Sequence, residues 1–168
     1  VSSFVGINAL DNDMRSFETS GTNYTFGYAQ GFWTPDNKSE TEMIWKRVED
    51  MSYTGNASYK YEGVIANRKI EGKIYSGETF GAGDYVISSY IYLEEGNTMK
   101  ALRTVLDLPT WTVITWDLEN LERGKWHKLS AVKNFADTPN NKFMFQIKAG
   151  DNPGVEGNQV FYLDNLSV

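Results

Sequence analysis

The sequence has no cysteine, a single histidine and only 4 prolines. Without cysteine, the chain cannot form a disulfide, a thiolate metal site or a cysteine nucleophile, although many exported bacterial proteins also lack this residue. Basic residues are also few, since 16 Lys and Arg stand against 22 Asp and Glu, for a net charge of −6. Nucleic acids and anionic membranes bind through an excess of Lys and Arg, so neither is an expected partner.

Long apolar runs are missing as well. No stretch approaches the roughly 18 apolar residues that span a bilayer, and the first residues lack the pattern of a signal peptide. We therefore expect a soluble domain whose export signal has been removed. No repeat or linker-like tract divides the chain, which predicts one domain over residues 1–168, with 1–13 as a leading strand or a linker.

Aromatic residues are abundant, with 10 Tyr, 9 Phe and 5 Trp, and short alternating runs bounded by Gly, Asn or Asp dominate the sequence. In the clearest run, residues 84–94, Tyr85, Ile87 and Ile91 occupy one face, whereas Tyr90 and Tyr92 occupy the other. Similar runs cover residues 43–51, 58–65, 100–106, 111–118, 126–132, 142–148 and 160–168. About nine strands predict an all-β, two-sheet β-sandwich of the jelly-roll type. Residues 118–123 are alternatively one helical turn.

Five segments carry a resemblance to a known family: residues 16–18, 54–60, 83–92, 124–129 and 161–166. Their pattern resembles the β-jelly-roll carbohydrate-binding modules of the group of families four, sixteen and twenty-two. The resemblance implies a secreted or cell-surface bacterial module, monomeric, that binds a polysaccharide without cutting it and targets an attached catalytic domain. Within these segments, Gly124-Lys125-Trp126 is interpreted as a turn followed by an aromatic side chain that fills the core.

The resemblance also implies a structural calcium ion. In the similar modules, a carboxylate beside the first strand and one in the last strand hold Ca²⁺ between them. The matching positions here are Glu18 and Asp164. Calcium accepts 6 to 8 oxygen ligands, so backbone carbonyls and water would complete the site.

Sugar rings are recognised by an aromatic plane flanked by hydrogen-bonding groups. Alternation places Trp45, Arg47 and Glu49 on one face of their strand, and this set is the preferred platform for a sugar. Tyr90 and Tyr92 are a second candidate, and Trp33 is a candidate rim contact. Arg103, Gln146 and Lys148 are the remaining candidates, on the polar faces of two further strands. Trp111 and Trp116 lie on opposite faces of one strand, so at most one of them meets a ligand.

The candidate arginines bear on the class of ligand, because a guanidinium pairs bidentately with a carboxylate or sulfate. Arg47, Arg68, Arg103 and Lys148 would form a local basic patch, which makes an acidic polysaccharide plausible, either alginate-like or a sulfated algal glycan. Xylan is in doubt, because residues 68–72 lack the tryptophan that the similar xylan-binding modules tend to carry there.

Two alternatives remain open. A jelly-roll polysaccharide lyase or glycosidase would share the architecture, but a lyase needs a base and an acid, and a glycosidase needs two carboxylates at a fixed separation. His127 is the sole histidine and follows Trp126 directly, so we do not expect it to be catalytic. No hydrolase, phosphate-loop or zinc-protease motif occurs. The second alternative is a cell-surface adhesion domain with the same sandwich fold.

Overall fold

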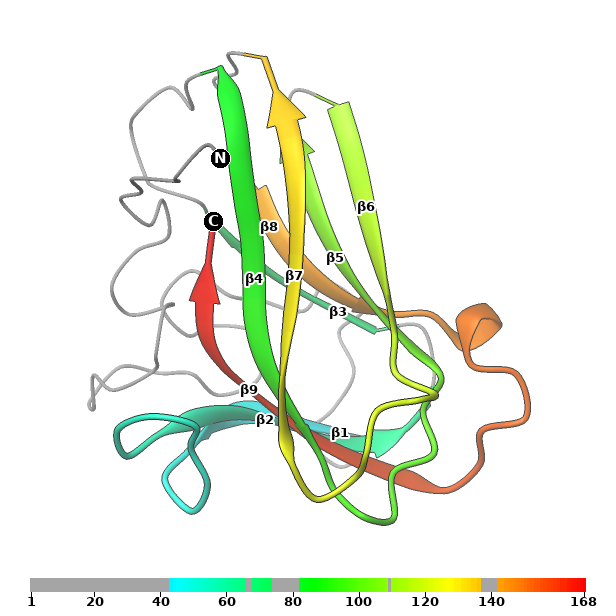
Figure 1. Ribbon diagram of the computed structural model, residues 1–168. Coiled ribbons are helices and arrows are strands. Elements are labelled where there is room, and N and C mark those ends of the chain that lie inside the picture. The colour runs from blue at the N-terminus through cyan, green and yellow to red at the C-terminus, as the bar shows by residue number, and fades with distance from the viewer. Residues whose placement is uncertain (1–42, 66–67, 74–81, 109, 137–141) are drawn as a thin grey trace.

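A computed structural model describes residues 43–65, 68–73, 82–108, 110–136 and 142–168. Over these ranges the chain forms nine strands in two antiparallel sheets, arranged face to face (Figure 1). The five-stranded sheet has the order β1-β2-β9-β4-β7, and the four-stranded sheet has the order β3-β8-β5-β6. The strands are β1 (Met43–Val48), β2 (Ser58–Val64), β3 (Arg68–Lys73), β4 (Gly83–Leu93), β5 (Ala101–Leu108), β6 (Thr110–Asp117), β7 (Trp126–Phe135), β8 (Lys142–Ile147) and β9 (Asn158–Ser167). The predicted all-β sandwich is confirmed.

Strand β4 follows the alternation predicted from its sequence. Ile87, Ile91 and Leu93 are buried in the core, and Tyr85 packs against it. Tyr90 and Tyr92, which alternate with these residues, face away from the core and are half-buried. A strand with one apolar face and one mixed face fits a sheet that packs on one side and meets solvent on the other.

The core lies between the two sheets and is rich in aromatic rings. The five-stranded sheet contributes Tyr59, Tyr61 and Phe161, and the four-stranded sheet contributes Phe143 and Phe145, all at most 1% exposed. The two core phenylalanines of β8 meet edge to face, with ring centroids 5.2 Å apart. These large rings bury much apolar area, which stabilises the sandwich without any disulfide.

The strand boundaries differ from the predicted ones in a few places. Strand β3 lies in residues 68–73, which were not predicted as a strand because Arg, Lys, Glu and Gly interrupt the apolar pattern. The alternative of a helical turn over residues 118–123 is wrong, because these residues form turns and bends. The helical element of the described residues is η1 (Ala149–Asp151), a single 3₁₀ turn. No described helix is long and apolar enough to cross a membrane.

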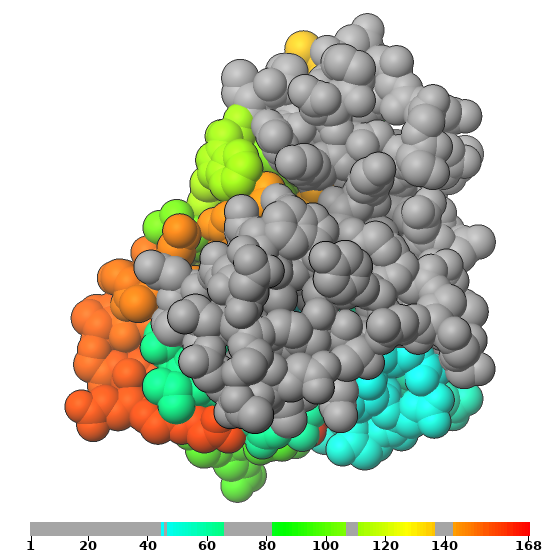
Figure 2. Space-filling view, turned by 180° about the vertical axis from the view of Figure 1, so that it is seen from behind, coloured from blue at the N-terminus to red at the C-terminus, as the bar shows by residue number. Residues whose placement is uncertain are grey.

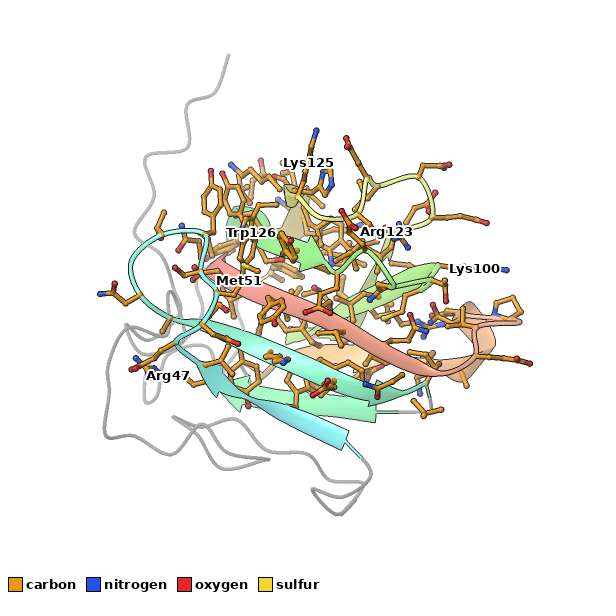
Figure 3. The ribbon with its side chains drawn as sticks, turned by 90° about the horizontal axis from the view of Figure 1, so that it is seen from below. Arg47, Met51, Lys100, Arg123, Lys125 and Trp126 are labelled. Carbon is orange, nitrogen blue, oxygen red and sulfur yellow. The ribbon has the colours of Figure 1, made fainter. Side chains whose placement is uncertain are left out.

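Polar side chains hold the loops together at the end of the sandwich where β4 joins β5. The Arg123 guanidinium donates to the backbone carbonyls of Asn97 and Met99 in one loop and to those of Leu118 and Leu121 in another. Its burial lowers the pKa of Arg123. In Figure 3, Arg123 lies beside the loop that carries Lys100. The loops of this end therefore form one ordered unit.

Candidate functional site

The sequence-predicted binding residues fall on different parts of the sandwich. Tyr90 and Tyr92 point away from the core on the five-stranded sheet, whereas Arg103 and Gln146 point away from it on the four-stranded sheet. The two outer faces lie on opposite sides of the molecule (Figure 1). These four predicted residues therefore lie on two separate surfaces instead of in one site.

Trp45 does not lie on an exposed platform. Its side chain is 1% exposed and belongs to the core, where it meets Tyr61 edge to face at 5.1 Å and Phe161 at 6.2 Å. The alternation predicted for β1 is right, since Trp45 pairs across the sheet with Tyr61 and Arg47 pairs with Tyr59. The predicted exposure of this face is wrong, because the same face of the neighbouring strands consists of core aromatic residues. A sugar cannot stack on Trp45 in this structure.

Arg47 lies at the end of β1 and pairs with a neighbouring carboxylate. Its guanidinium donates to Glu49 Oε1 over 2.7 Å, with the Arg47 side chain 14% exposed and that of Glu49 63% exposed. Seen from below in Figure 3, Arg47 lies at the foot of the β1–β2 connection, away from Trp126. Arg47 is therefore separate from the exposed rings of the five-stranded sheet.

On the four-stranded sheet, the structure brings two predicted residues together. Arg103 of β5 lies directly opposite Gln146 of β8 on one side and Thr115 of β6 on the other. Thr115 is exposed, whereas Gln146 is only 5% exposed. Trp111 lies four residues before Thr115 on β6, so the two side chains are on the same face of the sheet. The Trp111 side chain is 52% exposed. We call Arg103, Trp111, Thr115 and Gln146 the arginine face.

Trp111 and Trp116 have opposite environments, as their opposite strand parity requires. Trp116 is 8% exposed and donates its indole N–H to Thr104 Oγ1 over 2.8 Å within the core. Of these two tryptophans, Trp111 is the one available to a ligand. Seen from behind in Figure 2, yellow-green atoms from the first part of β6 and orange atoms from the region of η1 reach the surface at the same edge.

The Arg103 guanidinium is held in a fixed orientation by Asp151. Nε and Nη2 donate to the two carboxylate oxygens of Asp151 over 2.6 and 2.9 Å, so the pair is bidentate. These hydrogen bonds raise the pKa of Arg103. Lys148, another predicted binding residue, lies directly after β8 and is half-buried. Two of the five guanidinium N–H groups of Arg103 are thus used by Asp151.

A cluster of aromatic rings lies on the outer face of the five-stranded sheet. Tyr90 and Tyr92 of β4 are joined there by Trp126 of β7, Tyr162 of β9 and Tyr53 of the β1–β2 connection. Tyr53 stacks on Tyr90 at 3.8 Å with an interplanar angle of 14°. Trp126 contacts Tyr53 at 5.8 Å and Tyr92 at 5.5 Å, and Tyr92 contacts Tyr162 at 5.9 Å. We call these five residues the aromatic face.

Three members of the aromatic face, Tyr53, Trp126 and Tyr162, were not predicted as binding residues. Trp126 was expected in the core, but it pairs across the strands with Tyr92, and the core-facing Ile91 pairs with His127. The sequence does not show which side of β7 faces inward after the Gly124 turn. A core position and an outer position for Trp126 were therefore both compatible with the pattern. Tyr53 follows no strand pattern, because it lies in a connection.

Charges are distributed unevenly over the aromatic face. Burial, together with the nearby negative charges of Asp50, Glu94 and Glu62, raises the pKa of Tyr162, whose hydroxyl donates to Glu94 Oε1 over 3.2 Å. At the other end, a hydrogen bond with the Tyr90 hydroxyl raises the pKa of Tyr53, and Lys128 is near enough to oppose this shift. One end of the face is therefore acidic and the other carries an exposed lysine.

Asp164, the predicted calcium ligand, is completely buried at 0% exposure. Its Oδ2 accepts the backbone N–H groups of Tyr53 and Thr54 over 2.9 and 3.2 Å, and its Oδ1 accepts that of Asn165 over 2.8 Å. Within the ranges that the structure describes, no three Asp, Glu, His or Cys side chains gather as a metal site. The predicted partner of Asp164, Glu18, lies outside the described residues. The calcium ion stays a prediction.

His127, the histidine that a lyase mechanism would require, is occupied by a local contact. Its Nε2 lies 2.7 Å from the backbone carbonyl oxygen of Glu122. On the sheet it pairs with Ile91, whose side chain is in the core. This places the imidazole at the edge strand of the five-stranded sheet, on the opposite sheet from Arg103. Trp33 lies outside the described residues.

No protein-family model matches the sequence. No curated protein matches it either. Solved structures do match. The CBM22-1 xylan-binding domain of Paenibacillus barcinonensis Xyn10C aligns over 99% of this chain and 96% of its own, with 14% identity and a TM-score of 0.59. The module TmCBM61, solved with β-1,4-galactotriose, aligns over 96% and 97%, with 10% identity and a TM-score of 0.58.

An arabinose-bound family 51 α-L-arabinofuranosidase aligns over 95% of this chain with 15% identity and a TM-score of 0.64, but the chain spans only 26% of that enzyme. At such identities the likeness concerns the fold. The chain has the β-sandwich fold of carbohydrate-binding modules, and the resemblance expected from the sequence is confirmed. Fold alone does not determine function, because one scaffold hosts many kinds of site.

Proposed function

We propose that the protein binds a polysaccharide without cleaving it, and that the sugar chain lies on the arginine face. The observation that supports this most is Trp111, whose side chain is 52% exposed on the same sheet face as the fixed Arg103–Asp151 pair. An exposed indole offers apolar area that a ligand can remove from water, which favours binding. An aromatic plane beside oriented polar groups is the arrangement that a sugar ring requires.

The two kinds of group have separate roles in this proposal. The Trp111 ring packs against the C–H face of one sugar, which removes apolar surface from water. The Arg103 N–H groups that Asp151 does not use donate to sugar hydroxyls, and Thr115 both donates and accepts. Because Asp151 already fixes the guanidinium, little side-chain entropy is lost on binding.

The spacing favours an extended ligand. Trp111 and Thr115 are four residues apart on β6, which corresponds to roughly 13 Å at a rise of about 3.3 Å per residue. A single sugar is too short to contact both the indole and the polar row at Arg103. The ligand is therefore an oligosaccharide or a segment of a polymer.

An acidic ligand, alginate-like or a sulfated algal glycan, is the finer proposal. Two of the three arginines that suggested it already pair with carboxylates of the chain, Arg47 with Glu49 and Arg103 with Asp151. A ligand carboxylate or sulfate would have to replace one of these partners. On the arginine face that partner is Asp151, whose side chain is 22% exposed, whereas the Arg47–Glu49 pair lies on the other sheet. Acidic glycans are thus expected to bind with strong salt dependence.

The absence of catalysis is part of the proposal. His127 and Arg103 belong to different sheets, so these two side chains do not converge on one sugar as a lyase mechanism would require. The proposal extends to an extracellular or cell-surface location and to an attached catalytic domain that the module holds near its substrate. The structural calcium ion predicted at Glu18 and Asp164 belongs to the same proposal as a stabilising ion with no contact to the sugar.

The test is a glycan array that includes alginate, sulfated galactans, xylan and β-glucan, followed by titration of the best ligand. We expect Trp111→Ala to weaken binding about tenfold, equivalent to about 1.4 kcal/mol, with an unchanged melting temperature. Val132→Ala, at a residue 54% exposed on β7, serves as the matched control and should bind normally.

Three results would contradict the proposal. Unchanged affinity of Trp111→Ala would remove the arginine face from the binding site. Depolymerisation of a glycan by the pure protein would indicate a lyase or glycosidase. Failure to bind any glycan, with binding of a protein partner retained, would indicate the adhesion domain.

A further inference from the structure

The aromatic face has no role in the function proposed above, yet its rings form a continuous series. From Tyr162 through Tyr92, Trp126 and Tyr53 to Tyr90, each ring centroid lies between 3.8 and 5.9 Å from the next. The series crosses β9, β4 and β7 on the outer side of the five-stranded sheet. Tyr162 is 3% exposed and forms its floor, Tyr90, Tyr92 and Trp126 are half-buried, and Tyr53 is 42% exposed.

Tyr53 is held in place by its backbone as well as by the stacking of its ring on Tyr90. Its N–H and that of Thr54 donate to the buried carboxylate of Asp164. The Thr54 hydroxyl donates to Asn165 Oδ1 over 2.8 Å, and the tight turn is completed by Gly55, which has φ +68°. Figure 3 shows this connection arching beside Trp126, with Met51 on the same side. The exposed ring is thus presented by an ordered segment, at little entropic cost on binding.

The charges around the rings select against an anionic ligand. Asp50, Glu62 and Glu94 all lie near the Tyr162 hydroxyl, and Glu94 accepts a hydrogen bond from it. Lys60 also lies at this end and contacts both Glu62 and Tyr162. Its Nζ is 3.9 Å from Glu62 and 5.5 Å from the Tyr162 ring centroid. Carboxylates accept hydrogen bonds from hydroxyls but repel carboxylate and sulfate groups. Stacked rings edged by such acceptors suit an uncharged, hydroxyl-rich chain.

We propose that the aromatic face is a second glycan-binding surface, which takes a neutral sugar chain on the opposite side of the sandwich from the arginine face. Tyr53 and Trp126 provide the planes on which sugar rings stack. Glu94 and Lys128 provide hydrogen bonds at the two ends. The surface does not depend on the arginine face, since no residue is shared between them.

The experiment is mapping of backbone amide and indole NMR signals during titration with neutral oligosaccharides: xylohexaose, cellohexaose, mannohexaose and β-1,4-galactotriose. We expect at least one of them to shift the signals of Tyr53, Tyr90 and the Trp126 indole together. Tyr53→Ala should weaken this binding about tenfold, whereas Tyr53→Phe, which keeps the ring and loses only the hydroxyl, should retain it. The Tyr53→Ala variant should fold, because the bonds of residue 53 to Asp164 come from its backbone.

The same titrations in Trp111→Ala separate the two proposals. If the aromatic face binds independently, its signals still shift in Trp111→Ala while those around Arg103 do not. No shift at the aromatic face with any of the four oligosaccharides would overturn the second surface, as would equal affinity of Tyr53→Ala. A decaproline peptide is the comparison ligand, because tyrosine clusters also hold polyproline helices. Shifts with decaproline alone would identify a peptide-binding face and overturn the proposal.

Discussion

At the scale of single residues, Trp45 combines a large buried ring with a polar group that has no hydrogen-bond partner. Its indole Nε1 is buried without an acceptor in the part of the chain that the structure describes, while the ring packs against Tyr61 and Phe161. Burial of an unsatisfied N–H is costly, and burial of the ring is favourable. The favourable contribution of Trp45 therefore comes from its ring and not from its N–H group.

We therefore expect Trp45→Ala to destabilise the fold by about 3 to 5 kcal/mol, the usual cost of deleting a large buried ring. Trp45→Phe removes the unsatisfied N–H together with part of the ring and should cost distinctly less. Urea denaturation of the two variants measures the difference. A Trp45→Ala variant as stable as wild type would show that the ring is not part of the core.

At the scale of structural elements, Asn152 connects three of them. Its Oδ1 accepts the N–H groups of Lys100 and Ala101 over 2.8 and 3.0 Å, and its Nδ2 donates to the carbonyls of Ala101 and Lys148 over 3.1 and 2.9 Å. The side chain is 3% exposed. It thus joins the start of β5 to the end of β8 and to η1, next to the Arg103–Asp151 pair.

Removal of this side chain leaves several buried backbone groups without partners, each at a cost of about 1 to 3 kcal/mol. Asn152→Ala is therefore expected to lower the melting temperature strongly and to accelerate hydrogen exchange at Lys100 and Ala101. Asn120→Ala, at an exposed turn position, is the control and should have no effect. Unchanged exchange at Ala101 would show that the loops are held by other contacts.

The sequence predicts the elements better than it predicts the surfaces. Alternation in residues 84–94 gave β4 and both of its faces, because strand parity is a local property. For β1 the same rule grouped Trp45 with Arg47 correctly, but Ile44 and Trp45 are both apolar, so the pattern did not indicate which face is inward. The partner of Arg103 lies 48 residues away, and such contacts are set by the tertiary fold.

At the scale of the whole molecule, the predicted calcium ion would join distant parts of the chain, since Glu18 and Asp164 are far apart in the sequence. An ion that binds only the folded state stabilises it by about 2.7 kcal/mol at a hundredfold excess over Kd. We expect EDTA to lower the melting temperature and added Ca²⁺ to restore it, with a smaller effect of Mg²⁺. Differential scanning calorimetry at matched ionic strength is the measurement. An identical melting temperature with and without chelator would refute the calcium site.

The position of the two surfaces on opposite sheets affects how the molecule would act on a polymer. Two faces with separate ligands would allow one molecule to bridge two chains, and attachment to both raises the effective affinity through local concentration. With the acidic groups concentrated near Tyr162 on the aromatic face and the Arg103–Asp151 pair on the other sheet, the two bridged chains could differ in charge.

The contacts of Arg123 have a practical consequence. One guanidinium links the loop before β5 to the loop after β6 through four carbonyls, a connection that small secreted domains often make with a disulfide. Dithiothreitol cannot break this connection, and the native sequence contains no thiol. A cysteine introduced at Thr98, an exposed position of the same ordered end, would react alone with a maleimide dye and report on orientation with little local motion.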